Sequence, residues 1–188
     1  MPTPIVILDT GHGQKPDRAF DPGVTKGALR EVDLAGAYLD HAAEVLRARG
    51  WNVHRMSTGA YSARHAEAVR LVGSDRAIYV QGHVNAGGGR YALVEHDSRS
   101  TAGAKAAAML AHALTSLHGV SVGKVAGLAD GERGFTCIRG IWTAPRMCGL
   151  IYEPGFLDNA EHDRMWTPAG LMEVGVALAD GLTACWRG

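Results

Sequence analysis

Three polar residues of the types that bind metal ions or move protons follow short β-branched runs in this chain. His12, His83 and Glu153 each stand at or just after the end of such a run, and each run predicts a buried strand. In open α/β sheets the carboxyl ends of the strands form the edge at which ligands bind. We therefore expect these three side chains to lie at the same edge of one sheet.

A fourth residue, Glu31, is expected to join them from a helix. Apolar residues recur at steps of three and four from Val32 to Leu46, which predicts a helix with one stripe facing the sheet. Glu31 lies four residues before Ala35 and shares that face, where an unpaired carboxylate would be costly. The helix dipole gives its charge some support, but a bound cation such as a metal ion is the stronger explanation.

Two neutral imidazoles and one carboxylate are a donor set typical of catalytic zinc, which keeps one position for water. Zinc lowers the pKa of such a water toward about 7 and polarises a carbonyl group, while a further carboxylate can carry the proton to the leaving group. Glu153 is the natural candidate for that carboxylate. The alternative is four unrelated polar residues, each satisfied by its own neighbours. Their shared placement favours the metal site.

Around these residues, short strand-like runs alternate with longer helical patterns, which predicts a single α/β domain over residues 1–188. We expect strands at 4–9, 52–56, 77–81, 91–96, 135–138 and 149–152, and helices at 30–49, 62–71, 101–117 and from 168 to near the C-terminal end. Ser62 and Thr167 are expected to cap two of the helices. The glycine-containing segments 10–28 and 119–134 are interpreted as loops.

Composition excludes several classes of protein. Hydrophobic residues make up 46% and charged residues 20% of the chain, as in ordinary globular domains. The 19 basic and 19 acidic residues balance, so the basic surface of a nucleic-acid-binding protein is missing. No apolar run approaches the roughly 18 residues of a membrane anchor, and no standard export signal is evident. Cys137, Cys148 and Cys185 match no common metal or redox spacing and are expected to be reduced core thiols.

With these residues identified, the sequence resembles the zinc-dependent N-acetylmuramoyl-L-alanine amidases of the Amidase_3 type, which cut peptidoglycan between muramic acid and the stem peptide. Residues 8–13 resemble the opening Asp-x-Gly-His-Gly motif of that family, and residues 21–23 resemble its Asp-Pro-Gly. Residues 83–85 resemble its His-x-Asn, and residues 152–159 its closing Glu-x-Gly-Phe-x-x-Asn. The resemblance runs from end to end and implies the family's mixed, mostly parallel sheet flanked by helices, a phosphorylase/hydrolase-like fold.

The resemblance implies a role for each matching residue. One Zn²⁺ per chain would be held by His12, Glu31 and His83, and Glu153 would take a proton from the attacking water and return it to the departing amine. Asn85 and Asp21 are weaker candidates for substrate contact, and Asp21 also suits a turn before Pro22. The chain departs from the family at Gln81 and Gly82, which replace the usual Ser-Ile before the histidine, whereas Arg64 stands where the family has an arginine.

The expected activity is zinc-dependent hydrolysis of the amide between N-acetylmuramic acid and L-alanine, by a monomer that needs neither nucleic acid nor a membrane anchor. A zinc carboxypeptidase or endopeptidase acting on the stem peptide, and a non-catalytic peptidoglycan-binding module, are the alternatives. We expect a phage endolysin-like enzyme, made in the cytoplasm without a signal peptide and acting on the cell wall after release. A domain of a larger extracellular autolysin is the other possibility.

Overall fold

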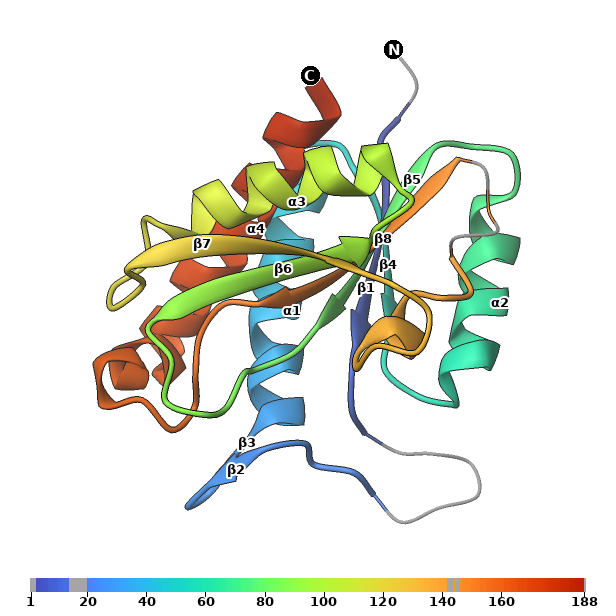
Figure 1. Cartoon of the computed structure of the whole chain (residues 1–188). Coiled ribbons are helices and arrows are strands. Elements are labelled where there is room, and N and C mark those ends of the chain that lie inside the picture. The colour runs from blue at the N-terminus through green and yellow to red at the C-terminus, as the bar shows by residue number, and fades with distance from the viewer. Residues whose placement is uncertain (1–2, 14–19, 142–143, 145, 188) are drawn as a thin grey trace.

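The computed structural model describes residues 3–13, 20–141, 144 and 146–187. Its main sheet contains β1 (Ile5–Thr10), β4 (Asn52–Met56), β5 (Ala77–Gly82), β6 (Tyr91–Asp97), β7 (Val122–Leu128) and β8 (Met147–Glu153). The strand order is β4-β1-β5-β8-β6-β7, and every pair is parallel except β6 with β8 (Figure 1). The order places β1, β5 and β8 side by side, so the carboxyl ends of these three strands meet.

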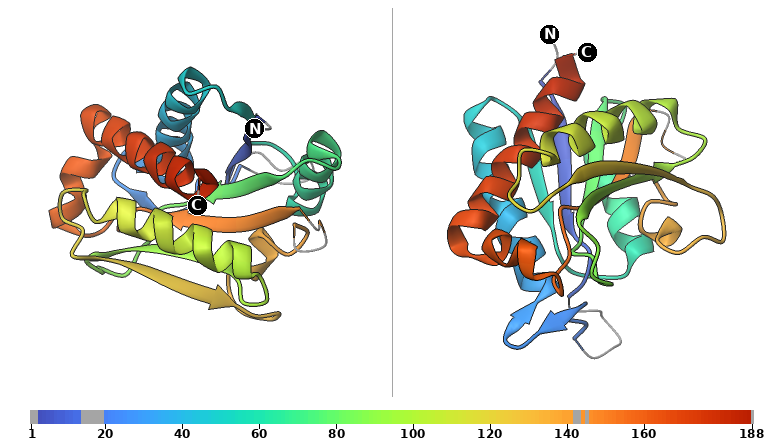
Figure 2. Two further views of the ribbon diagram at one scale, coloured as in Figure 1. Left: turned by 90° about the horizontal axis from the view of Figure 1, so that it is seen from above. Right: turned by 60° about the vertical axis from the view of Figure 1, so that its left-hand side comes forward.

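Helices cover both faces of the sheet. Helices α1 (Glu31–Ala48), α3 (Thr101–Leu114) and α4 (Pro168–Arg187) pack over one face, and α2 (Tyr61–Val72) packs over the other (Figure 2). Strand β1 shows the division: Val6 and Leu8 belong to the core under α1, whereas Ile5 and Ile7 belong to the core under α2. A sheet buried on both faces requires continuous apolar strands, which explains the run from Ile5 to Leu8.

The predicted fold class is confirmed, and most predicted elements lie within two or three residues of their observed bounds. Thr167 caps α4 as expected, because its Oγ1 accepts a hydrogen bond from the amide of Gly170 at 3.2 Å. The Ser62 prediction is wrong: α2 begins at Tyr61, and its N-cap Ala60 makes no side-chain hydrogen bond. The three cysteines are buried and free of disulfides, in agreement with the predicted core thiols.

The predicted loop at 119–134 is wrong because it contains edge strand β7, which pairs with β6. The glycines there serve close packing: a Cβ at Gly123 would collide with the backbone of Ala111 on α3. The predicted strand at 135–138 is instead the 3-10 helix η1 (Phe135–Cys137). It follows the left-handed residue Gly134 (φ 89°), whose carbonyl accepts a hydrogen bond from the amide of Cys137 at 2.8 Å.

The predicted loop at 10–28 contains a short hairpin that was not expected. Strands β2 (Thr25–Lys26) and β3 (Leu29–Arg30) pair antiparallel directly before α1, and residues 14–19 of this segment lie outside the described residues. The 3-10 helix η2 (Ala160–Trp166) lies between β8 and α4. The hairpin and η2 are linked by an ion pair between Lys26 and Asp163 at 2.6 Å.

Of the described helices, α4 has the length and apolar composition of a membrane-spanning segment. Its stretch Pro168–Trp186 has a mean hydropathy of 1.2 in its most apolar window, and 56% of that window is buried inside the fold. The buried side of α4 packs against α1 and α3. The apolar composition of α4 is accounted for by its place in the core.

Candidate metal centre

His12, Glu31 and His83 meet at the carboxyl ends of β1 and β5. His12 follows β1, His83 follows β5, and Glu31 is the first residue of α1. One ligand atom from each residue lies within 4.8 Å of the other two. Oε1 of Glu31 is 2.9 Å from Nδ1 of His83 and 3.3 Å from Nε2 of His12, and the two imidazole rings stand edge to face. The structure thus brings together the three residues that the sequence assigned to a metal.

Two glycines make room for these side chains. A Cβ at Gly23 would collide with the carboxylate of Glu31, and a Cβ at Gly11 would collide with the imidazole of His83. Gly23 also has a left-handed backbone, with φ of 69°. The Asp-Pro-Gly and Asp-x-Gly-His-Gly segments therefore supply glycines against which Glu31 and His83 are packed.

Glu31 is a buried carboxylate held in one orientation. Its side chain is 3% exposed, and its two oxygens accept hydrogen bonds from the amides of Val84 (2.9 Å) and Val24 (2.8 Å). Burial raises the pKa of Glu31, but hydrogen bonds with His12 and His83 outweigh burial and hold the pKa well below its usual range. The site is therefore built around a permanent negative charge that faces two imidazole nitrogens, an arrangement suited to a cation.

Asp21 lies beside His12. Its Oδ2 is 3.1 Å from Nδ1 of His12, and its Oδ1 accepts a hydrogen bond from the amide of Gly23 at 3.1 Å. Asp21 thus forms the turn that its sequence context predicted and also faces the imidazole nitrogen opposite Glu31. Metal-bound histidines commonly carry such a carboxylate on their second nitrogen, which fixes the ring orientation.

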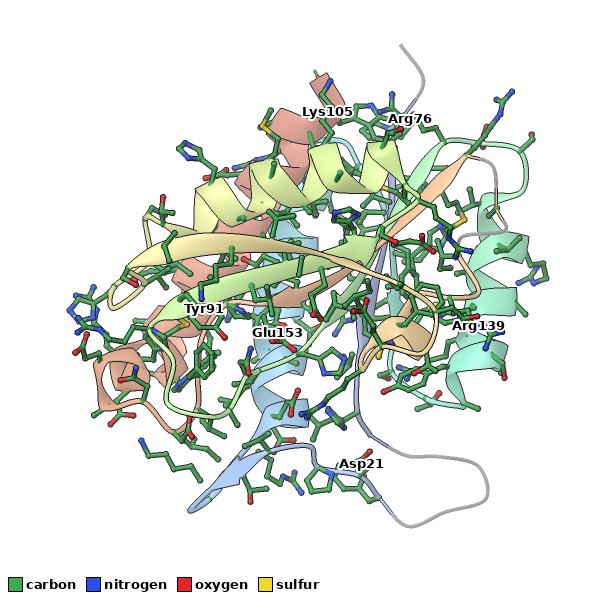
Figure 3. All side chains as sticks on the ribbon, in the orientation of Figure 1. Asp21, Arg76, Tyr91, Lys105, Arg139 and Glu153 are labelled. Carbon is green, nitrogen blue, oxygen red and sulfur yellow. The ribbon has the colours of Figure 1, made fainter. Side chains whose placement is uncertain are left out.

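Glu153 shares a cleft with the three ligand candidates. The cleft has a volume of about 840 Å³, and its lining includes His12, Glu31, His83 and Glu153. Figure 3 shows Glu153, at the end of β8 beside β6, and Asp21, near the β2–β3 hairpin. Burial, with the neighbouring carboxylates of Glu95 and Glu31, raises the pKa of Glu153 to about 8, while Arg133 acts in the opposite direction. A carboxyl group with a pKa near neutrality is suited to accept and return a proton.

Asn85 contacts Glu153 directly. Its Nδ2 donates a hydrogen bond to Oε2 of Glu153, and its Oδ1 accepts one from the amide of Ala86 at 2.8 Å. The backbone of Asn85 bonds to that of Gly155 and Leu157. The sequence placed Asn85 among weaker substrate contacts, and the structure adds a contact with Glu153 to that prediction.

Sequence reasoning missed Glu95 on β6. The antiparallel register pairs Leu93 with Glu153, so Glu95, two residues further along β6, presents its side chain on the same face and lines the cleft. Burial raises the pKa of Glu95. The sequence carried one signal for Glu95. Along the predicted strand at 91–96, the apolar residues Ala92 and Val94 lie on one face, so Glu95 lies on the other.

The remaining histidines lie away from the cleft lining. His65 and His162 are buried and pair with backbone carbonyl oxygens of Cys137 and Gly119, and His96 pairs with that of Asp97. His41 lies near Glu44 on the outer part of α1. These four histidines therefore have structural or surface positions.

Comparison with known proteins identifies the fold. The sequence matches no protein-family model and no curated protein, but solved structures superpose well. The catalytic domain of CwlV, an N-acetylmuramoyl-L-alanine amidase from Bacillus (Paenibacillus) polymyxa var. colistinus, has a TM-score of 0.76 and 19% identity, covering 98% of this chain and 99% of that one. The amidase Ami1 from Mycobacterium smegmatis has a TM-score of 0.76 and 18% identity, with 98% and 97% covered.

Cwp6 from Clostridium difficile has a TM-score of 0.78 and 19% identity, and the match covers 97% of this chain but 29% of Cwp6. This chain thus spans less than a third of Cwp6 and nearly the full length of the CwlV and Ami1 structures. At these identities the comparison establishes the architecture. The chain has the α/β fold of N-acetylmuramoyl-L-alanine amidase catalytic domains.

Proposed function

We propose that this protein hydrolyses the amide bond between N-acetylmuramic acid and L-alanine in bacterial peptidoglycan, with one zinc ion held by His12, Glu31 and His83. The observation that carries the proposal is the cleft in which these three residues meet. Glu153 lines the same cleft but is not one of the three proposed ligands. A fold shared with structures named as N-acetylmuramoyl-L-alanine amidases supports the same reaction.

The donor set fits zinc. Ligands bound to one tetrahedral zinc ion at about 2.0–2.1 Å lie roughly 3.3 Å from each other. The contacts of Glu31 Oε1 with His83 Nδ1 (2.9 Å) and His12 Nε2 (3.3 Å) are already close to that spacing. Two imidazoles and one carboxylate are also the set found where a catalytic zinc keeps a position for water. When bound, zinc would supply Lewis-acid polarisation of the amide carbonyl and acidify a water molecule.

Glu153 is proposed to move the proton. Its carboxylate accepts a proton from the attacking water, and the resulting acid donates that proton to the nitrogen of the departing L-alanine. Asn85 holds Oε2 of Glu153 through its side-chain amide, which leaves Oε1 to face the water.

The proposed partner is peptidoglycan, and the proposed place of action is the cell wall. The chain is proposed to work as a monomer. The chemistry of the cleft is compatible both with a phage enzyme that acts after release and with part of an exported autolysin. Size-exclusion chromatography with light scattering tests the monomeric state.

Mass spectrometry of digested peptidoglycan tests the bond that is cut. We expect intact stem peptides with a free L-alanine amino group, glycan strands that keep their lactyl groups, and no new reducing ends. Glu153→Gln protein purified in the same way is the matched control, because it keeps the proposed zinc ligands. Activity that survives verified metal removal would contradict the metal-dependent reaction.

Other products would identify the rivals. New reducing ends would indicate a glycosidase, which relies on a pair of carboxylates. Fragments that begin at an internal residue of the stem peptide would favour the endopeptidase, and release of the terminal amino acid alone would favour the carboxypeptidase. Binding to peptidoglycan without any product would favour the non-catalytic module.

A further inference from the structure

We infer that Gln81 is a positioning residue that fixes which nitrogen of His83 faces the metal position, an inference that rests on the metal centre in the proposed function. Oε1 of Gln81 lies 3.0 Å from Nε2 of His83, on the far side of the ring from Glu31. Nδ1 of the same ring lies 2.9 Å from Oε1 of Glu31. When Nε2–H of an imidazole donates a hydrogen bond to Gln81, the free electron pair of the ring is on Nδ1.

The orientation of the Gln81 amide is set by Asp9. Asp9 and Gln81 are direct neighbours in the parallel register of β1 and β5. Nε2 of Gln81 donates to Oδ2 of Asp9 at 3.2 Å and also lies 3.3 Å from the hydroxyl oxygen of Tyr79. A flipped amide would turn its oxygen toward the Asp9 carboxylate and its NH₂ group toward His83. The observed orientation therefore makes Oε1 the acceptor for His83.

Asp9 is itself held by two further donors. Arg64 donates from Nη1 to Oδ1 of Asp9, and the hydroxyl of Tyr79 donates to Oδ2. Asp9, Tyr79 and Gln81 are completely buried, and Arg64 is 4% exposed. Buried polar groups keep their partners because an unsatisfied group in the interior is costly. The chain of bonds from Arg64 to His83 thus has one consistent set of donors and acceptors.

Arg64 also fixes the surface on which His83 rests. Its guanidinium donates to the carbonyl oxygens of Thr10 at 2.5 Å and Gly11 at 3.1 Å. Gly11 packs against the His83 ring so closely that a Cβ there would collide with it. Gly11 is therefore packed against the ring around Nε2, Gln81 bonds to Nε2 itself, and Nδ1 is directed toward Glu31.

A carboxylate or carbonyl oxygen on the second nitrogen of a metal-bound histidine sets the tautomer, and loss of such a group typically weakens metal binding by about 10–100-fold. Gln81 supplies a neutral oxygen to His83, whereas Asp21 supplies a carboxylate near His12. Gln81 is also one of the positions at which the sequence departs from the amidase motif. The longer amide side chain reaches from β5 to both Asp9 and the imidazole.

Nitrogen-15 NMR of the zinc-loaded protein tests this assignment. We expect His83 to carry its proton on Nε2 and to coordinate through Nδ1. Gln81→Met, which keeps the length but has no amide, should weaken zinc binding by about 10–100-fold in a chelator competition and lose the single-tautomer signature. Tyr152→Phe is the matched control: it removes a buried hydroxyl that bonds to the backbone of Val174 on α4, outside the chain of bonds from Arg64 to His83. It should lower the melting temperature and leave zinc affinity within about twofold.

The outcomes separate this inference from the proposed function. Coordination through Nε2 in the wild type, or unchanged zinc affinity in Gln81→Met, would overturn the role of Gln81. If Gln81→Met does not fold, the assignment of the coordinating nitrogen in the wild type decides by itself. A wild-type protein that binds no zinc would contradict the proposed function, and the tautomer of His83 in the metal-free protein would still decide whether Gln81 selects it.

Discussion

Asn85 donates a hydrogen bond from its side-chain amide to Oε2 of Glu153, across the ends of β5 and β8. His83 lies two residues before Asn85, so the segment that supplies one ligand candidate also orients the proposed proton carrier. The backbone bonds of Asn85 to Gly155 and Leu157 hold the same two segments together. The relative position of the metal centre and Glu153 is therefore fixed by adjacent strands.

Glu153→Gln should separate chemistry from metal binding. The amide is nearly isosteric and can still hydrogen-bond to water, but it cannot accept the water proton, so kcat should fall by about 10²–10⁴-fold. Zinc content and melting temperature should stay close to those of the wild type. Measuring all three quantities on one preparation makes the test decisive: loss of zinc would make Glu153 a ligand, and unchanged turnover would place the proton carrier elsewhere.

His12→Ala, Glu31→Ala and His83→Ala should each lose most of the bound zinc, measured by elemental analysis after dialysis against a weak chelator. Each change removes one of three donor atoms in a set that lies within 4.8 Å, and lysis of peptidoglycan should fall with the metal. The wild type should hold about one zinc per chain.

His41→Ala and His112→Ala are the controls for the ligand variants. Neither residue lines the cleft, and both lie on helices away from the ends of β1 and β5. They should keep zinc and activity at wild-type levels. Zinc loss from these controls equal to that from the ligand variants would show that the ligands are wrongly assigned.

Gly23→Ala should disturb the metal centre without touching a ligand. A Cβ at position 23 would collide with the Glu31 carboxylate, so zinc affinity should fall at least tenfold. Gly27→Ala is a matched control, since Gly27 also has positive φ (59°) but open space around the added carbon. Both variants should lose about 1–2 kcal/mol of stability to backbone strain, and equal zinc affinity in both would refute the packing role of Gly23.

The meeting of the site residues could be foreseen because it depends on strand ends. Short apolar runs locate β1, β5 and β8, and parallel neighbours bring His12, His83 and the last residue of β8 to one edge. Glu31 could be added from helical periodicity, since a carboxylate on the sheet-facing side of a helix needs a partner. These inferences use local patterns and one rule of sheet geometry.

Contacts set by packing between distant elements could not be foreseen. Arg64 and Asp9 are 55 positions apart, and their pairing depends on how α2 lies over the sheet. Strand β7 escaped detection because its glycines resemble those of a loop, although Gly123 serves the close approach of α3. Alternation along β6 indicates the face on which Glu95 lies, but its place beside Glu153 depends on the antiparallel register of β6 with β8, which the sequence alone does not specify.

Glu95→Gln should shift the pH dependence of the reaction toward acid. Glu95 and Glu31 raise the pKa of Glu153 in addition to burial, and Arg133 lowers it. Removing the charge of Glu95 stabilises the ionised form of Glu153, so its pKa falls. The ionised form is the proposed base and is populated above that pKa, so the acid limb of kcat/KM should move to lower pH.

Arg133→Gln should move the same limb in the opposite direction, because it removes the positive charge that favours ionised Glu153. Glu44→Gln, on the exposed side of α1, should leave the limb unchanged and controls for a general effect of net charge. The measurement is kcat/KM against pH for all three variants and the wild type on one soluble muropeptide. Shifts of the same sign in Glu95→Gln and Arg133→Gln would rule out Glu153 as the group whose ionisation sets the acid limb, because opposite charges beside one carboxylate must move its pKa in opposite directions.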